Sequence, residues 1–175
     1  MVLTIRQFVE ISAILQKEWD DNLEREIAII AAYHNISLGE VEGFQIERLK
    51  EEVTRLSKLM TEIPEEGYPV KFKLKGRKFK VITDIQRLTA GQYIDVKTLC
   101  VDPFNDLHLM CAILCQPCKD KEYRGESVPE RAKFFYENMP VQIAYPLMMF
   151  FFRLLEALNT NIQGFLKTKV LEGSQ

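Results

Sequence analysis

Cysteine and histidine side chains, which can bind metal ions or act as nucleophiles, gather in one stretch of the sequence. Cys100, His108, Cys111, Cys115 and Cys118 all lie between residues 100 and 118. Zinc takes four thiolate or imidazole ligands in a tetrahedral site, and two cysteines four residues apart lie on one face of a helix. The same cysteines stand in an apolar run, where free cysteine behaves as a small hydrophobic side chain. The sequence favours structural cysteines over a zinc site, and a thiol switch is a third interpretation.

No arrangement typical of an active site is found elsewhere in the chain. Cys115 and Cys118 have the spacing of a redox pair, but they lie at the C-terminus of the predicted helix 105–115, whereas a reactive thiol needs a helix N-terminus. The only histidines, His34 and His108, have no nucleophile motif around them, and there is no glycine-rich phosphate loop. We therefore expect no enzyme activity, no catalytic residues, no bound metal and no cofactor.

Lysines alternate with apolar residues between positions 70 and 81, as expected for a hairpin with one charged face. The lysines are Lys71, Lys73, Lys75, Lys78 and Lys80. They could form an ordinary solvated face or protect a strand edge from pairing with other chains, bind an acidic protein, or follow a phosphate backbone. Nucleic acid is the least favoured, because Phe72 and Phe79 fall on the opposite face and cannot stack on bases.

A second candidate surface is the apolar segment 147–152. A helix that is apolar on all sides is either buried or bound to another chain, and methionine and phenylalanine adapt well to irregular surfaces. Both interpretations stay open. The candidate partner-binding residues are Lys71, Lys73, Lys78, Lys80, Met148, Met149, Phe150 and Phe151.

Charge is distributed unevenly along the 175 residues, although the net charge is only -2. Residues 1–66 hold 7 basic and 14 acidic side chains, whereas residues 67–100 hold 8 and 2. The asymmetry suits either a charged partner or pairing within the fold. The longest apolar run, 144–152, is too short for a membrane span, and no secretory signal is present. Four cysteines then indicate a reducing compartment and free thiols.

Apolar spacing defines the elements that must position these residues. It predicts helices over 4–15, 21–34, 45–60, 89–99, 105–115, 129–136 and 140–158, the last kinked or broken at Pro146. The hairpin turn is expected around Gly76, which can adopt positive φ. The expected fold is mainly helical with a central β-hairpin.

Part of the sequence looks duplicated. Leu3-Thr4-x-x-Gln7 recurs as Leu88-Thr89-x-x-Gln92, and each copy is followed by an apolar run, at 26–32 and at 110–115. This pairing matches Cys111 with Ile27 and Cys115 with Ala31. Because isoleucine and alanine are typical core residues, the match again favours a core role for the two cysteines. A repeated unit is usually a folding and docking unit. We expect two pseudo-repeated helical units, 1–66 and 88–175, joined by the hairpin connector 67–87.

Several stretches resemble small structural or assembly proteins encoded among the morphogenesis genes of tailed bacteriophages, particularly phages of gut Bacteroidetes. They are LEREIAIIA at 23–31, GEV at 39–41, LTAGQYID at 88–95, MPVQIA at 139–144 and FFF at 150–152. The resemblance implies a non-enzymatic, tail-assembly-chaperone-like protein or a minor virion component, such as a cargo or head–tail protein. It implies other phage structural proteins as partners, with self-association as a further candidate. The implied location is the host cytoplasm during assembly, or the virion. The alternative from another class is a small zinc-stabilised or nucleic-acid-binding module.

Overall fold

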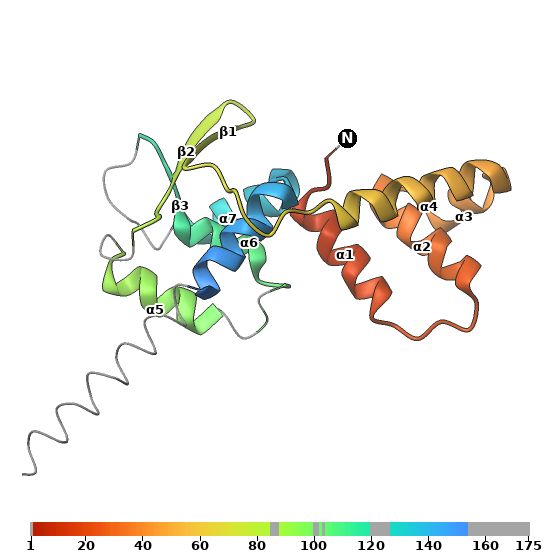
Figure 1. Cartoon of the computed structure of the whole chain (residues 1–175), viewed down its shortest axis with the longest axis horizontal. Helices are drawn as coiled ribbons and strands as arrows, with labels where there is room; N and C mark the ends of the chain where they lie inside the picture. Colours follow the sequence, from red (N-terminus) through yellow and green to blue (C-terminus); the bar gives the residue numbers. More distant parts are fainter. Residues whose placement is uncertain (1, 85–87, 100–101, 103, 120–126, 154–175) are drawn as a thin grey trace, which may run out of the picture.

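The protein is mainly helical and carries one small antiparallel sheet (Figure 1). The computed structural model describes residues 2–84, 88–99, 102, 104–119 and 127–153. The elements are α1 (Ile5–Leu15), α2 (Asn22–His34), α3 (Leu38–Glu42), α4 (Ile46–Thr61), β1 (Lys71–Leu74), β2 (Arg77–Val81), α5 (Ala90–Leu99), α6 (Leu107–Leu114), β3 (Cys115–Pro117), α7 (Val128–Asn138) and a helix over 141–153. The predicted fold class is confirmed. In the described ranges, no helix combines the length and apolar character that crossing a bilayer requires.

The N-terminal helices begin at residues that satisfy their first backbone N–H groups. Thr4 and Gln7 form a reciprocal capping box at the start of α1, and the carboxylate of Asp21 accepts from the N–H of Leu23 (2.8 Å) at the start of α2. A second capping box, between Ser37 and Glu40, starts the short helix α3. Helix α3 was not predicted from the sequence, because Asn35 and Gly39 are residues typical of turns.

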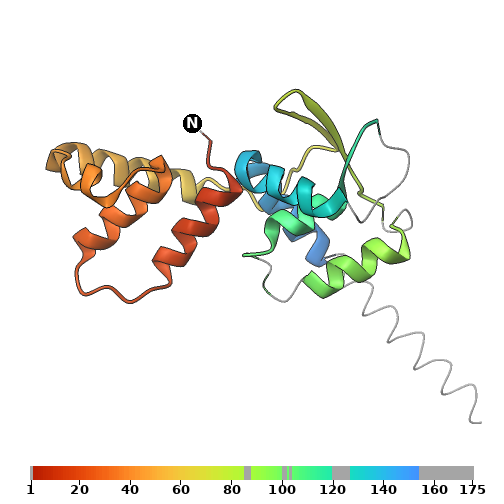
Figure 2. The same cartoon turned by 180° about the vertical axis from the view of Figure 1, so that it is seen from behind.

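The hairpin is built as predicted, but it is not an isolated connector. Lys75 (φ 44°) and Gly76 (φ 82°) form its two-residue turn, a conformation that matches the twist of the flanking strands. Strand β2 also pairs with β3, giving the order β1-β2-β3. Strand β3 was missed because the residues after Cys115 have loop composition. The sheet therefore joins the hairpin to the second half of the chain (Figure 2).

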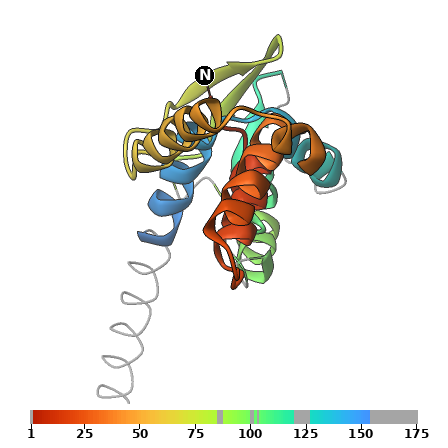
Figure 3. The same cartoon turned by 90° about the vertical axis from the view of Figure 1, so that its right-hand side faces the viewer.

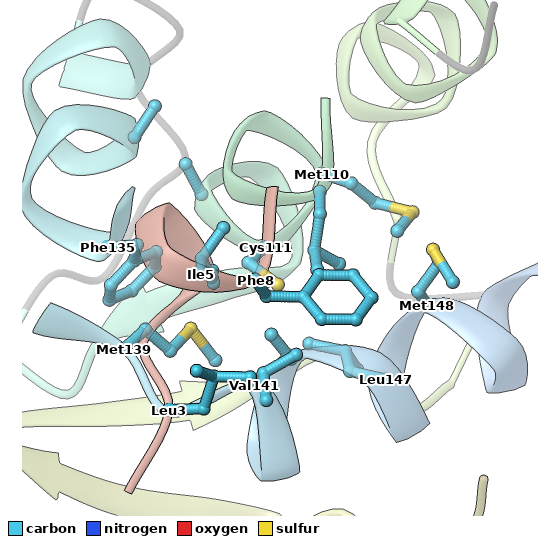
Figure 4. Close-up of a cluster of buried hydrophobic side chains, with 14 of the residues drawn as sticks. Leu3, Ile5, Phe8, Met110, Cys111, Phe135, Met139, Val141, Leu147 and Met148 are labelled. Carbon is cyan, nitrogen blue, oxygen red and sulfur yellow. The ribbon is translucent and has the colours of Figure 1, made fainter. Parts of the chain in front are cut away.

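Helix α6 lies at the centre of the core. Six of its eight residues are buried: Leu107, Met110, Cys111, Ala112, Ile113 and Leu114. Side chains from α1, α7 and helix 141–153 surround it, among them Phe8, Phe135 and Leu147 (Figure 4). Helix 141–153 continues through Pro146, so the predicted break is absent there. Pro146 is buried, and packing against the core offsets the backbone hydrogen bond that proline removes. The predicted remainder, 154–158, lies outside the described residues.

The last four carbonyl groups of α6 have no partners within a regular helix, yet each one is hydrogen-bonded. The carbonyl of Cys111 accepts from the N–H of Cys115. Arg131 Nε of α7 donates to the carbonyl of Ala112 (2.6 Å). Gln92 Nε2 of α5 donates to that of Ile113 (3.1 Å), and the N–H of Ile82 donates to that of Leu114 (2.9 Å). Three separate segments are thereby fixed to one helix end.

The first residues of the chain join the two halves of the molecule. The N–H of Ile5 donates to the carbonyl of Met139 (3.0 Å), and the N–H of Val141 donates to that of Leu3 (2.8 Å). Arg6 then links α1 to the end of α2 through Asn35 Oδ1 (2.8 Å) and to α7 through Glu137 (3.2 Å). Packing and polar contacts thus both converge on the start of α1.

The two similar sequence stretches share a hydrogen-bond arrangement. Thr89 and Gln92 make the same reciprocal contacts as Thr4 and Gln7. Gln7 Nε2 donates to the carbonyl of Tyr33 on α2 (2.6 Å). In the same way, Gln92 Nε2 donates to the carbonyl of Ile113 on α6. If the two acceptor residues, Tyr33 and Ile113, are aligned with each other, Cys111 is matched with Ala31. The sequence comparison matched Cys111 with Ile27 instead, which lies one helical turn earlier. The duplication itself stays a prediction.

We expect Gln92→Ala to lower the free energy of unfolding by about 1–3 kcal/mol, because it leaves the buried carbonyl of Ile113 without a donor. Gln7→Ala should cost less, because Gln7 is half-buried whereas Gln92 is 1% exposed. Urea unfolding measures both changes. The exposed Gln16→Ala serves as control, and a Gln92→Ala effect no larger than that of the control would contradict this account.

Candidate functional site

The cysteine stretch forms part of the core. Cys111 and Cys115 are buried at 0% exposure, and Cys118 is exposed. Burial raises the pKa of the Cys111 and Cys115 thiols well above their usual range, so neither forms the thiolate that binds zinc or attacks a substrate. Among the described residues, no three His, Cys, Asp or Glu side chains are grouped to hold a metal ion. Cys100 lies outside the described residues.

The two histidines occupy separate environments. His108 is half-buried, its ring meets that of Tyr136 edge to face at 5.0 Å, and burial lowers its pKa. It lines an open hollow of about 410 Å³ together with Val9 and Lys133. His34 lies 3.0 Å from a carboxylate oxygen of Glu52 and links α2 to α4. Each histidine thus contacts a neighbouring helix, His108 through Tyr136 of α7 and His34 through Glu52 of α4.

The apolar segment 147–152 is largely inside the molecule. Met148 is 2% exposed and Phe151 is 1% exposed, so a partner cannot reach them unless helix 141–153 moves. Met149 and Phe150 are half-buried, and the Phe150 ring packs on Tyr68 at 4.9 Å. Of the apolar residues proposed to bind a partner, only Met149 and Phe150 retain partial access to solvent.

The four candidate lysines form one surface, which we call the lysine face: Lys71, Lys73, Lys78 and Lys80. The hairpin register sets Lys71 opposite Lys80 and Lys73 opposite Lys78. Side chains directly opposite on one face have their Cβ atoms about 5 Å apart, and like charges there are destabilising. Lys80 is half-buried, and the other three are exposed. The hairpin therefore concentrates positive charge where lysines repel one another.

Aromatic packing on the opposite face of the hairpin stabilises the strands despite the repulsion between the lysines. Phe72 and Phe79 stack with ring centres 5.4 Å apart, and Phe79 meets Phe135 of α7 at 4.9 Å. Phe79 is 2% exposed. Arg77 lies on this side too, over the ring of Phe134 at 4.7 Å. Aromatic packing against α7 fixes the hairpin and leaves the lysine face directed away from the core.

Charge pairing within the fold does not neutralise the lysine face. Over the described ranges, the recorded ion pairs involve Arg6, His34, Arg55, Lys58 and Arg153 as cations. None of them includes a lysine of this face. The interpretation that the acidic N-terminal half pairs with the basic hairpin inside one molecule therefore has no support in these contacts.

Edge protection accounts for only half of the lysine face. In the described sheet, β1 is an edge strand, so Lys71 and Lys73 stand where lysine deters pairing with another chain. Lys78 and Lys80 lie on β2, which is hydrogen-bonded on both sides, to β1 and β3. A central strand has no free edge to protect. For the two lysines of β2, the remaining interpretations are a solvated face and a binding surface.

A basic cavity adjoins the hairpin turn and was not anticipated. It has a volume of about 580 Å³ and lies between β2, β3 and the start of α7. Arg77, Lys78, Lys119 and Arg131 line it, along with the acidic Glu130. Arg131 is 8% exposed. The sequence did not predict that Arg131 is buried, because an arginine in the amphipathic helix expected at 129–136 should lie on the solvent side.

Lys73→Glu should stabilise the protein by about 0.5 kcal/mol, because it turns a repulsive cross-strand pair with Lys78 into an attractive one. Urea unfolding at low ionic strength measures the change, and most of the gain should disappear in 1 M salt. Lys97→Glu, at an exposed position on α5, is the matched control. A loss of stability specific to Lys73→Glu would show that the two lysines do not repel each other.

In a Cys100→Ser background, we expect a thiol reagent to modify Cys118 in the folded protein. Cys111 and Cys115 should react only on unfolding, because burial raises their pKa and excludes the reagent. Mass spectrometry after brief alkylation measures the sites. Rapid modification of Cys111 under native conditions, or zinc-dependent protection of Cys118, would instead indicate a functional thiol cluster.

Comparisons with known proteins give no information about the role of the lysine face. No family model matches the chain, and searches of curated proteins and of solved structures gave no match. The feature that stands out is a rigid, unneutralised basic surface on a hairpin.

Proposed function

We propose that the chain is a non-enzymatic docking protein whose lysine face binds an acidic surface of another protein. One observation carries the proposal: two pairs of directly opposed lysines, without a carboxylate partner in the described fold. Such pairs lower the stability of the free protein. A surface that costs stability yet is held rigidly in place is typical of a binding site.

An acidic partner would gain from this arrangement in two ways. Each carboxylate placed between opposed lysines interacts with both, which removes their repulsion as well as adding an attraction. The aromatic packing of Phe72 and Phe79 already fixes the backbone beneath, so less conformational entropy is lost on binding. The concentrated charge also speeds the encounter at low ionic strength.

A protein surface fits better than a nucleic acid. Proteins that bind single strands place aromatic rings among their basic residues, but the rings of Phe72 and Phe79 pack toward α7, behind the lysines. Four lysines would neutralise at most about four phosphates, a weak site by the standards of DNA-binding proteins. Nucleic acid is accordingly an outcome to be tested rather than the proposed partner.

We place this docking activity in the assembly of a tailed bacteriophage, either as a tail-assembly-chaperone-like factor or as a minor virion, cargo or head–tail protein. The support for this context is the sequence resemblance of stretches 23–31, 88–95 and 139–144. The partners would be other phage structural proteins, met in the host cytoplasm during assembly. Mass spectrometry of purified virions tests whether the polypeptide stays in the particle.

Lys73→Glu/Lys78→Glu should weaken binding to immobilised poly-glutamate at least tenfold, because the charges that attract the carboxylates are reversed. Lys50→Glu/Lys97→Glu, which changes two exposed lysines of α4 and α5 by the same net charge, is the matched control. Affinity is measured as a function of salt, with a short duplex DNA as competitor. Equal losses in both variants would refute a localised site, and tighter binding of the duplex would replace the protein partner with a nucleic acid.

A further inference from the structure

We infer that the acidic surface recognised by the lysine face is the α1–α2 corner of a second copy of this chain, so that copies associate head to tail. This inference rests on the proposed docking function and adds the identity of the partner. We call the corner, residues 15–24, the acidic tip. It lies in the acidic N-terminal half, whose excess charge is not neutralised by the hairpin within one molecule.

The acidic tip combines negative charge with exposed apolar side chains. Its four carboxylates, from Glu18, Asp20, Asp21 and Glu24, are all exposed, and Lys17 is the only basic residue in the segment. None of the four takes part in a recorded ion pair in the described structure. Leu15 is 49% exposed and Leu23 is 41% exposed. Charge and apolar area together are what a specific docking surface requires.

Local hydrogen bonds hold the tip in one conformation. Trp19 Nε1 donates to the carbonyl of Ile14 (2.9 Å), which places the indole beside the end of α1. The carboxylate of Asp21 caps α2 by accepting from the N–H of Leu23. An ordered tryptophan in such a position is typical of interface hot spots.

The lysine face offers the complementary set. Three of its four lysines are exposed, and together they supply positive charge that complements the four carboxylates of the tip. Other acidic parts of the N-terminal half fit less well. Near the end of α4, the carboxylates of Glu62 and Glu66 already pair with Lys58 and Arg153. Another acidic part lies around α3. There the Glu40 carboxylate is occupied by the capping box of Ser37, and the guanidinium of Arg48 lies nearby, over the ring of Phe44.

The lysine face and the acidic tip of one molecule cannot bind each other. In all three views, the hairpin turn lies at the top of the molecule and the α1–α2 corner at the bottom (Figures 1–3). A contact between two different surfaces that lie on opposite sides of the molecule is heterologous, and such a contact generates open chains or rings rather than a closed two-fold dimer. Each added copy would present a new lysine face and a new acidic tip.

Two one-sided variants test the inference. Lys73→Gln/Lys78→Gln removes charge from the lysine face and keeps the tip, whereas Glu18→Gln/Asp20→Asn does the reverse. At low salt, sedimentation should show concentration-dependent oligomers for the natural sequence and at least tenfold weaker self-association for each variant. Neutral replacements are used because they create no new attractive pair. An equimolar mixture of the two variants should form 1:1 dimers and nothing larger, because only one intact face of each kind is present.

Trp19 provides an independent signal, since the chain has a single tryptophan. Its emission should shift to the blue in the mixture of variants but not in either variant alone. A natural protein that stays monomeric at low salt, or a tip variant that self-associates normally, would overturn the inference. If poly-glutamate binding still depends on Lys73 and Lys78, the docking function survives that result. Loss of that dependence would remove the docking function as well.

Discussion

The satisfied C-terminal end of α6 is the constraint on which the rest of the structure depends. A helix buried on nearly every side cannot leave its last carbonyl groups to water, and each unmet group would cost about 1–3 kcal/mol. Here Arg131 brings in α7, Gln92 brings in α5, and the backbone of Ile82 brings in the sheet. The polar requirement of one helix end therefore determines how three other segments pack, and the apolar core fills the space between them.

The lysine face follows from this arrangement. Ile82 comes directly after β2, so its bond to α6 fixes the strand that carries Lys78 and Lys80. Phe79 packs the same strand against Phe135. A free two-stranded hairpin is at best marginally stable and would not keep like charges opposed. Anchored on two sides, the hairpin can hold an electrostatically unfavourable surface ready for a partner. The stability of the core and the availability of the site are thus connected through one strand.

The sequence was informative wherever the determining contacts are local. Thr4, Asp21 and Gln45 mark helix starts that the structure places one residue later, and alternation with Gly76 located the hairpin. Contacts between distant segments were not readable. β3 forms only because α6 delivers Cys115 to the edge of β2, and Pro146 stays helical because the core surrounds it. The alternation of lysines with apolar residues was visible in the sequence. That Lys73 lies directly opposite Lys78 became clear only from the register of the two strands. Burial of Met148 and Phe151 was one of two open alternatives.

The pairing of residues 3–5 with residues 139–141 has a consequence for biosynthesis. A chain leaves the ribosome from its N-terminus, so Leu3 and Ile5 emerge long before Met139 and Val141 exist as partners. Local helices such as α2 and α4 can form during translation, because their contacts are close in sequence. The start of α1 must wait, with its apolar side chains uncovered, until residues 139–141 have been made. Closure of this part of the core therefore depends on residues that are synthesised well after α1.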